Sequence, residues 1–247
     1  MDIRILKDKY ELGKEAGKEA AAIIRKTIAD NGCANVILAT GASQFEMLEQ
    51  LVSEKDIDWS KVRIFHLDEY IGLPESHKAS FRKYLKERFI NKVGKLLEVY
   101  LINGDAANPQ EECDKLGAII KQYPIDIAFV GIGENGHLAF NDPPANFEIE
   151  DPYLVVDLDE VCRAQQMGEG WFASINDVPK QAISMSIKQM MKAKRIICAV
   201  PDKRKAQAVS DCLTLPVSNL HPSSILQNHP NCIFFLDSSS AALLDKR

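Results

Sequence analysis

Runs of apolar residues alternate with amphipathic, charge-rich stretches along almost the whole chain. In the first amphipathic stretch, residues 10–29, Leu12, Ala16, Ala20 and Ile23 recur near helical spacing, and a Gly follows at position 32 to end the helix. Further helices are predicted at residues 44–52, 78–91, 109–122, 202–212 and 238–244. Strands are predicted at residues 35–40, 62–68, 99–102, 125–131, 153–158, 182–187, 195–200 and 232–236.

The order of these elements predicts an α/β fold. Continuous apolar runs such as Ile-Ile-Cys-Ala-Val at residues 196–200 are typical of strands that are buried on both faces. Strands that alternate with helices form parallel sheets. We therefore expect a three-layer α/β/α, Rossmann-like fold, with a mostly parallel sheet and helices on both faces. One domain over residues 1–247 is expected, with the irregular stretch at residues 142–179 as a lid.

Composition narrows the classes of function. The chain has 247 residues, 46% of them hydrophobic, and a net charge of −5, without a basic patch of the kind that binds nucleic acid. No apolar run approaches 18 residues and the N-terminus does not resemble a signal peptide, so we expect a cytoplasmic protein with no membrane partner. The six cysteines include no C-x-x-C pair, which favours buried free thiols over a zinc site. Both a monomer and a homo-oligomer fit this composition.

Polar or glycine-rich residues follow four of the predicted strands. They are Thr40-Gly41-Ala42-Ser43, Asp68-Glu69, the segment from Gly133 to Asp142, and Pro201-Asp202-Lys203. In parallel sheets, ligands bind outside the carboxyl ends of the strands. Four such strand ends in one sheet therefore predict a ligand site there.

Two of these strand ends suit an anion. The turn at residues 40–43 leads from a strand into a helix, whose N-terminus favours a phosphate, although Ser43 could equally be a simple N-cap. Lys203, Arg204 and Lys205 lie in the first turns of another helix, where the helix dipole disfavours cations. An anionic ligand would offset that cost, while at least one of the three is expected to be a solvated surface charge.

The other two strand ends suit proton transfer. Gly131, Gly133 and Gly136 allow a tight turn that presents His137, and histidine can exchange protons near neutral pH. Asp68 and Glu69 point to opposite faces if their strand continues, so one carboxylate is expected to reach the pocket. Asp68 and His137 would then form an acid/base site.

The glycines also match the G-x-G-x-x-G pattern of dinucleotide-binding proteins, with Asp157 about 20 residues further on. That pattern requires a full helix after the third glycine. Here Pro143-Pro144 follows within a few residues and prevents such a helix. The sequence therefore argues against a nicotinamide cofactor.

Three motifs together carry a family resemblance. They are Ala39-Thr-Gly-Ala-Ser43, Phe65-His-Leu-Asp-Glu-Tyr-Ile-Gly-Leu-Pro74 and Gly131-Ile-Gly-Glu-Asn-Gly-His-Leu-Ala-Phe-Asn-Asp-Pro143. In these motifs the chain resembles the glucosamine-6-phosphate deaminase/isomerase family, which shares its fold with 6-phosphogluconolactonases. The His-Leu-Ala-Phe-Asn run is the form found in deaminases, whereas lactonases usually have a different run after the histidine.

The resemblance implies conversion of glucosamine 6-phosphate and water to fructose 6-phosphate and ammonia, without a metal or redox cofactor. It implies that His137 shuttles a proton during ring opening, with Asn135 and Asp142 beside it, and that Asp68 carries a proton between C2 and C1. The phosphate and sugar contacts implied are Thr40, Gly41, Ala42, Ser43, Glu69, Gly136 and Lys205.

The chain departs from the family pattern at three places. Asn135 stands where the family usually has aspartate, Asp142 stands where it usually has glutamate, and no arginine precedes Trp171-Phe172. Arg163, Lys203 or Arg204 are the alternatives for the missing phosphate-binding arginine. Lactone hydrolysis and a sugar-phosphate sensor without turnover remain the competing functions.

Overall fold

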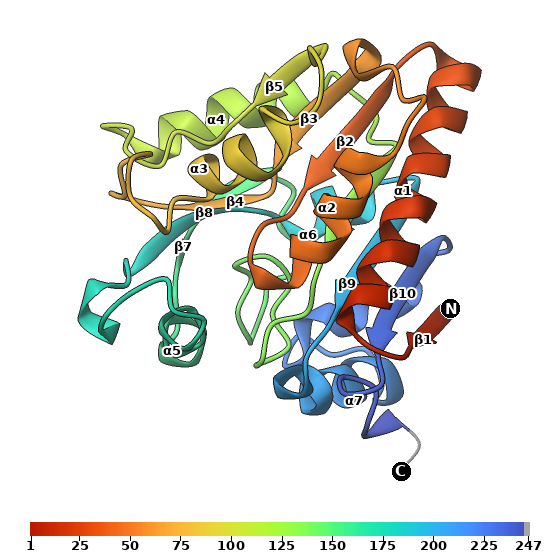
Figure 1. Cartoon of the computed structure of the whole chain (residues 1–247). Coiled ribbons are helices and arrows are strands. Elements are labelled where there is room, and N and C mark those ends of the chain that lie inside the picture. Colours follow the sequence, from red (N-terminus) through yellow and green to blue (C-terminus); the bar gives the residue numbers. More distant parts are fainter. Residues whose placement is uncertain (245–247) are drawn as a thin grey trace.

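The computed structural model describes residues 1–244 and is built around a seven-stranded sheet in which every neighbouring pair is parallel (Figure 1). The strand order is β1-β10-β9-β6-β2-β3-β5. The bounds are β1 Asp2–Leu6, β2 Ala34–Leu38, β3 Val62–His66, β5 Glu98–Tyr100, β6 Ile127–Val130, β9 Arg195–Val200 and β10 Cys232–Asp237.

Helices cover both faces of this sheet because its strands alternate their apolar side chains between two cores. In β9, Cys198 belongs to the core under α4 (Pro109–Ile120), α6 (Ile187–Met191) and α7 (Ala206–Thr214). Its neighbours Ile197 and Ala199 belong to the core under α1 (Lys9–Asn31), α2 (Phe45–Ser53) and α3 (Phe81–Leu85). The prediction of a three-layer α/β/α fold with a mostly parallel sheet is confirmed.

A second, three-stranded antiparallel sheet lies beside the large one, in the order β4-β8-β7 (Figure 1). It consists of β4 (Asp68–Tyr70), β7 (Tyr153–Asp157) and β8 (Gln181–Met185). Our expectation that the strands near residues 153–158 and 182–187 belong to the parallel sheet was therefore wrong. Their apolar pattern identifies them as strands but not the sheet they join.

The strand predicted at residues 62–68 is divided between the two sheets at Leu67. The Leu67 N–H donates to the carbonyl of Leu38 in the large sheet, and its carbonyl accepts from the N–H of Met185 in the small sheet. β3 therefore ends at His66, and Asp68 begins β4. This crossing places Asp68 where the two sheets meet.

Three other element predictions need correction, and two elements were missed. Residues 142–179 are not irregular throughout, because they contain β7 and helix α5 (Glu160–Gly168). The helix predicted at residues 78–91 begins only at Phe81, after the N-cap Ser80, and continues as a π-helical turn (η3, Lys86–Ile90). Residues 238–243 form turns instead of a helix, and the edge strand β1 and the short helix α6 were not predicted.

The remaining short elements are 3₁₀ turns: η1 (Ala42–Gln44), η2 (Trp59–Lys61), η4 (Ile175–Asp177), η5 (Lys203–Lys205) and η6 (Pro222–Asn228). Over residues 1–244, no helix combines the length and apolarity that a membrane crossing requires.

Candidate active site

A cleft opens at the carboxyl ends of β2, β3, β6 and β9, where the topology of a parallel sheet favours ligand binding. Helix α5 and the first turn of α3 also border it. The residues lining it are Ala39, Thr40, Gly41, Ala42, Ser43, Leu67, Asp68, Phe81, Gly131, Ile132, Gly133, His137, Ala139, Phe140, Gln165, Gln166, Glu169 and Lys205. Three of the four strand ends singled out from the sequence contribute residues to this lining. The fourth, residues 201–203, directly precedes the turn that carries Lys205.

One end of the cleft is suited to an anion. The turn at residues 40–43 leads through η1 into the N-terminus of α2, and Gly41 has a φ of 89°, which suits glycine far better than other residues. Lys205 also lines the cleft, although only 5% of its residue surface is exposed. Burial lowers the pKa of Lys205, against a smaller opposing effect of the Glu169 and Glu134 charges, and no carboxylate within residues 1–244 comes within ion-pair distance of it. A buried ammonium without an ion-pair partner favours an anionic ligand.

The three residues considered as substitutes for a phosphate-binding arginine do not line the cleft. Arg163 donates to the carbonyls of Ile175 and Val178 and so ties α5 to η4. Arg204 pairs with Asp202 and Glu134, and Lys203 is exposed. Among the described residues, Lys205 is therefore the cation that the cleft presents.

Asp68 also lines the cleft, at the start of β4 and beside the Thr40 hydroxyl, and is 7% exposed. Burial, followed by the nearby charge of Glu69, raises the pKa of Asp68 to about 8, against a smaller opposing effect of the Thr40 hydroxyl. A carboxyl group tuned to this range can accept and return a proton near neutral pH.

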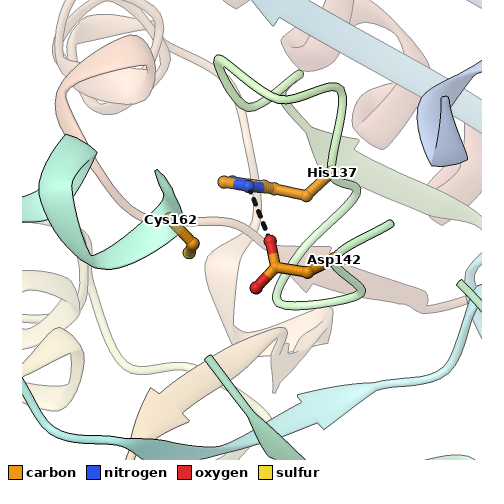
Figure 2. A group of neighbouring side chains, drawn as sticks. All are labelled: His137, Asp142 and Cys162. Carbon is orange, nitrogen blue, oxygen red and sulfur yellow. Dashed lines mark ion pairs between the residues drawn. The ribbon is translucent and has the colours of Figure 1, made fainter. Parts of the chain in front are cut away.

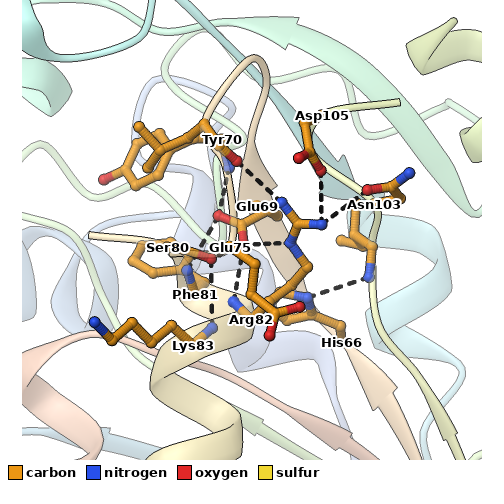
Figure 3. A network of polar contacts seen from close by, with 12 residues as sticks. His66, Glu69, Tyr70, Glu75, Ser80, Phe81, Arg82, Lys83, Asn103 and Asp105 are labelled. Carbon is orange, nitrogen blue, oxygen red and sulfur yellow. Dashed lines mark hydrogen bonds and ion pairs between the residues drawn. The ribbon is translucent and has the colours of Figure 1, made fainter. Parts of the chain in front are cut away.

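Glu69 points away from the cleft into a buried polar network (Figure 3). Its carboxylate accepts from the backbone N–H groups of Phe81 and Arg82 at 3.1 and 2.8 Å, and from the Ser80 hydroxyl at 3.0 Å. The Arg82 guanidinium lies 3.4 Å away. Glu69 thus holds the first turn of α3, and this placement does not support the direct substrate contact that we expected for it.

His137 and Asp142 face each other across the loop that follows β6 (Figure 2). His137 Nδ1 lies 3.2 Å from Asp142 Oδ1, within ion-pair distance, but the two are not aligned for a hydrogen bond. Burial alone would raise the pKa of Asp142, but the contact with His137, helped by Asn135 and the Asp159 N–H, leaves that pKa below its usual value. Asp142 therefore stays ionised beside the His137 ring.

The loop around His137 is fixed by its backbone. The His137 N–H donates to Asn135 Oδ1 at 3.1 Å, and the His137 carbonyl accepts from the Ser223 hydroxyl and the Gly133 N–H at 2.9 and 3.0 Å. Gly136 has a φ of 83° and does not line the cleft, so its role is to shape the turn. No helix begins directly after Gly136, since the next one is α5 at Glu160, and this removes the structural basis of a dinucleotide site at these glycines.

His137, Asp142 and Cys162 bring potential ligand atoms within 4.8 Å of one another (Figure 2). Zinc binds nitrogen, oxygen and sulfur ligands of this kind, with the cysteine as a thiolate. Burial raises the pKa of the Cys162 thiol, which favours the protonated form over the thiolate that a metal needs. The proton-transfer roles described below require only the imidazole and the carboxylates.

The chain is similar to known proteins over nearly its whole length. Residues 7–234 match the family model of glucosamine-6-phosphate isomerases/6-phosphogluconolactonases. The chain is 37% identical over 232 residues to a glucosamine-6-phosphate deaminase of Streptococcus uberis, covering 94% of this chain and 96% of the relative. It is 34% identical over 238 residues to one of Streptococcus pneumoniae, covering 96% and 98%.

The chain belongs to the glucosamine-6-phosphate isomerase/6-phosphogluconolactonase family. A monomeric glucosamine-6-phosphate deaminase of known structure superposes with a TM-score of 0.90 at 30% identity, covering 98% of this chain and all of that one. A 6-phosphogluconolactonase from Trypanosoma brucei superposes with a TM-score of 0.80 at 17% identity, covering 98% of each chain, and so shows a shared fold alone. The resemblance seen in the sequence motifs is confirmed.

Sequence reasoning missed one wall of this family member's cleft. Gln165, Gln166 and Glu169 reach it from α5, which we had treated as irregular. The signal was present, because Asp159 precedes the helix as an N-cap and Glu160 follows in the first turn. Phe81 and Phe140 were also missed, since their place in the cleft depends on how α3 and the loop after β6 pack.

Gly133→Ala should disable the site through His137. A methyl group at position 133 would lie 2.3 Å from the His137 ring, closer than any relaxed contact. We expect kcat in the assay proposed below to fall by roughly 10²-fold, since small displacements of catalytic groups have effects of this size. Gly94→Ala is the matched control, because a methyl group there meets open space. Equal activity of the two variants would contradict the packing argument.

Proposed function

We propose that this protein is a glucosamine-6-phosphate deaminase, which converts glucosamine 6-phosphate and water to fructose 6-phosphate and ammonia. The observation that carries the proposal is that Asp68 and His137 line the same cleft as Lys205 and the turn at residues 40–43. Two proton-transfer groups thus border the same cleft as an anion-binding end. Relatives at 34–37% identity over nearly the whole chain carry the same name.

The phosphate would bind at the anion end of the cleft. The backbone of Gly41, Ala42 and Ser43, the Thr40 hydroxyl and the positive end of α2 would surround it, and Lys205 would supply the charge. A sugar phosphate held there would extend its reacting carbons toward Asp68 and His137.

The reaction would proceed by two kinds of proton transfer. First, His137, oriented by Asp142, would move a proton between the C1 hydroxyl and the ring oxygen, which opens the ring to the aldehyde. Ionised Asp68 would then remove the proton from C2 and return it to C1, while a second proton moves from the amine nitrogen to the C1 oxygen, leaving an imine at C2. Water adds to this imine and ammonia leaves, giving the ketone.

Helix α5 would close the cleft during these steps. It lies in the segment at residues 142–179 that we expected to act as a lid, and it brings Gln165, Gln166 and Glu169 to the cleft. Closing the cleft would exclude bulk water from the open-chain intermediates.

The proposal is tested by incubating the purified protein with glucosamine 6-phosphate and measuring ammonia and fructose 6-phosphate together. Equal amounts of both products are expected. A parallel assay with 6-phosphogluconolactone addresses hydrolysis, and calorimetry with fructose 6-phosphate addresses binding without turnover. Acid release from the lactone without ammonia release would replace the proposal with lactone hydrolysis, and tight binding without either product would replace it with a sensor.

The pH dependence should follow Asp68. The base must be ionised, and the pKa of Asp68 is raised to about 8, so the active fraction of the free protein increases with pH. We expect kcat/KM to rise about tenfold per pH unit below pH 7 and to level off above about pH 8. The kcat/KM profile must first be corrected for the ionisation of the substrate's own amine and phosphate, which is measured separately by NMR. A corrected profile that is flat between pH 6 and 9 would refute this role of the raised pKa.

A further inference from the structure

We propose that Asp159 is a positioning residue that latches helix α5 onto the His137–Asp142 pair through Asn135. This inference rests on the proposed function for its kinetic consequences, but its structural part stands independently. It also gives a physical reason for asparagine at position 135. We refer to Asn135, Asp142 and Asp159 as the latch.

The orientation of Asn135 is fixed by the loop that carries His137. Its side-chain oxygen accepts from the His137 N–H at 3.1 Å, so its amide nitrogen must point to the other side. There Nδ2 donates to Asp142 Oδ1 at 3.0 Å and to Asp159 Oδ2 at 3.1 Å. One amide group therefore bridges two carboxylates, which uses both of its N–H bonds.

Asp142 is held at both of its oxygens. Asn135 donates to Oδ1, and the backbone N–H of Asp159 donates to Oδ2 at 3.1 Å. One hydrogen bond to each oxygen fixes the plane of the Asp142 carboxylate. In this plane, Asp142 Oδ1 points toward His137 Nδ1. The side chain of Asp142 is only 9% exposed, so these bonds are protected from solvent.

Asp159 joins this arrangement to the helix. Its Oδ1 accepts from the backbone N–H of Cys162 at 2.5 Å and thereby caps α5. The same helix is also seated by Gln165, which accepts from the Glu134 N–H at 2.9 Å, and by Gln166, which accepts from the Tyr70 hydroxyl at 2.7 Å. A shift of α5 away from the cleft would therefore pull directly on Asp142.

Charge explains why the amide is needed. With aspartate at position 135, a third carboxylate oxygen would stand about 3 Å from those of Asp142 and Asp159, and like charges at that distance repel strongly. Asn135 removes this repulsion and replaces it with two hydrogen bonds to charged acceptors. The asparagine and Asp159 are thus matched to each other.

The test combines Asp159→Asn, Asn135→Asp and the double variant, with Asp8→Asn as the matched control. Asp8 caps α1 in the same way, away from the cleft, and asparagine caps helices as well as aspartate does. Two readouts are measured: kcat and KM for ammonia release, and hydrogen exchange of residues 160–168 in the absence of substrate.

We expect Asp159→Asn to lower kcat about tenfold, with a smaller change in KM, and to speed hydrogen exchange in α5. The NH2 group of the new asparagine would face the NH2 group of Asn135, and two donors cannot form a hydrogen bond. Asn135→Asp should lower kcat roughly 10²-fold. The double variant should recover about tenfold over Asn135→Asp, since the amide introduced at position 159 would then donate to the new carboxylate. Asp8→Asn should change neither readout.

The proposed role of the latch is wrong if Asp159→Asn gives the same two readouts as Asp8→Asn, or if the double variant is no more active than Asn135→Asp. Should the unmodified protein release no ammonia, the proposed function fails and exchange alone decides the latch. Faster exchange of α5 in Asp159→Asn then supports it, and exchange as slow as in the Asp8→Asn control rejects it.

Discussion

Asp68→Asn should lower kcat for glucosamine 6-phosphate by about 10³-fold or more, the largest loss we expect from a single conservative change. Asparagine has nearly the same shape but cannot accept a proton, and proton transfer by a placed side chain typically contributes roughly 10²–10⁴-fold. Asp68 lines the cleft, and its pKa is raised to about 8. The measurement is the initial rate of ammonia release.

Binding separates this effect from a loss of structure. At the phosphate end of the cleft, Asp68 lies beside the Thr40 hydroxyl, and the amide oxygen of asparagine can accept from that hydroxyl as the carboxylate does. Lys205 and the backbone of residues 41–43 are unchanged in the variant. Calorimetry should therefore show fructose 6-phosphate bound by the variant with similar affinity. Asp30→Asn, on the exposed surface of α1, controls for a change of this type elsewhere. Undiminished turnover in Asp68→Asn would remove Asp68 as the proton carrier.

His137→Gln should lower kcat on the closed-ring substrate by about 10²-fold, because glutamine cannot shuttle a proton to the ring oxygen. An open-chain substrate analogue bypasses that step, so the variant should lose much less activity on it. The comparison of the two substrates is the measurement, with His221→Gln, outside the residues lining the cleft, as control.

Equal losses of His137→Gln on the two substrates would contradict a role in ring opening. They would instead place His137 in the C2-to-C1 proton transfer or in the general support of the site. Because the His137 backbone bonds to Asn135, Ser223 and Gly133 do not involve the ring, the loop itself should keep its shape in the variant.

Local sequence signals were sufficient for most elements of the large sheet. The unbroken apolar runs of β9 and β10 predict that these strands are buried on both faces, and the alternation of strands with helices predicts parallel pairing. The same signals failed for β7 and β8, which have comparable apolar patterns but pair antiparallel in the small sheet. Strand partners are chosen by contacts far apart in sequence, so a pattern of single residues does not report them.

Asp68 and Glu69 are a second case in which the sequence predicts local geometry but not tertiary contacts. The sequence predicts that adjacent strand residues face opposite sides, and the structure agrees. It does not say which one faces the cleft. That is decided by the crossing at Leu67 between the two sheets and by the packing of α3, whose first N–H groups take up Glu69.

By itself, the sequence determined the fold class, the family and the strand ends that border the cleft, because these depend on hydrophobic periodicity and on short contiguous motifs. Only the tertiary structure decided that Arg163, Lys203 and Arg204 do not line the cleft, that α5 forms one of its walls, and that Asp159 lies beside Asn135. Residues 135 and 159 are far apart along the chain, and a hydrogen bond between them leaves no periodic signal. Its existence depends on how the loop after β6 and the start of α5 pack together.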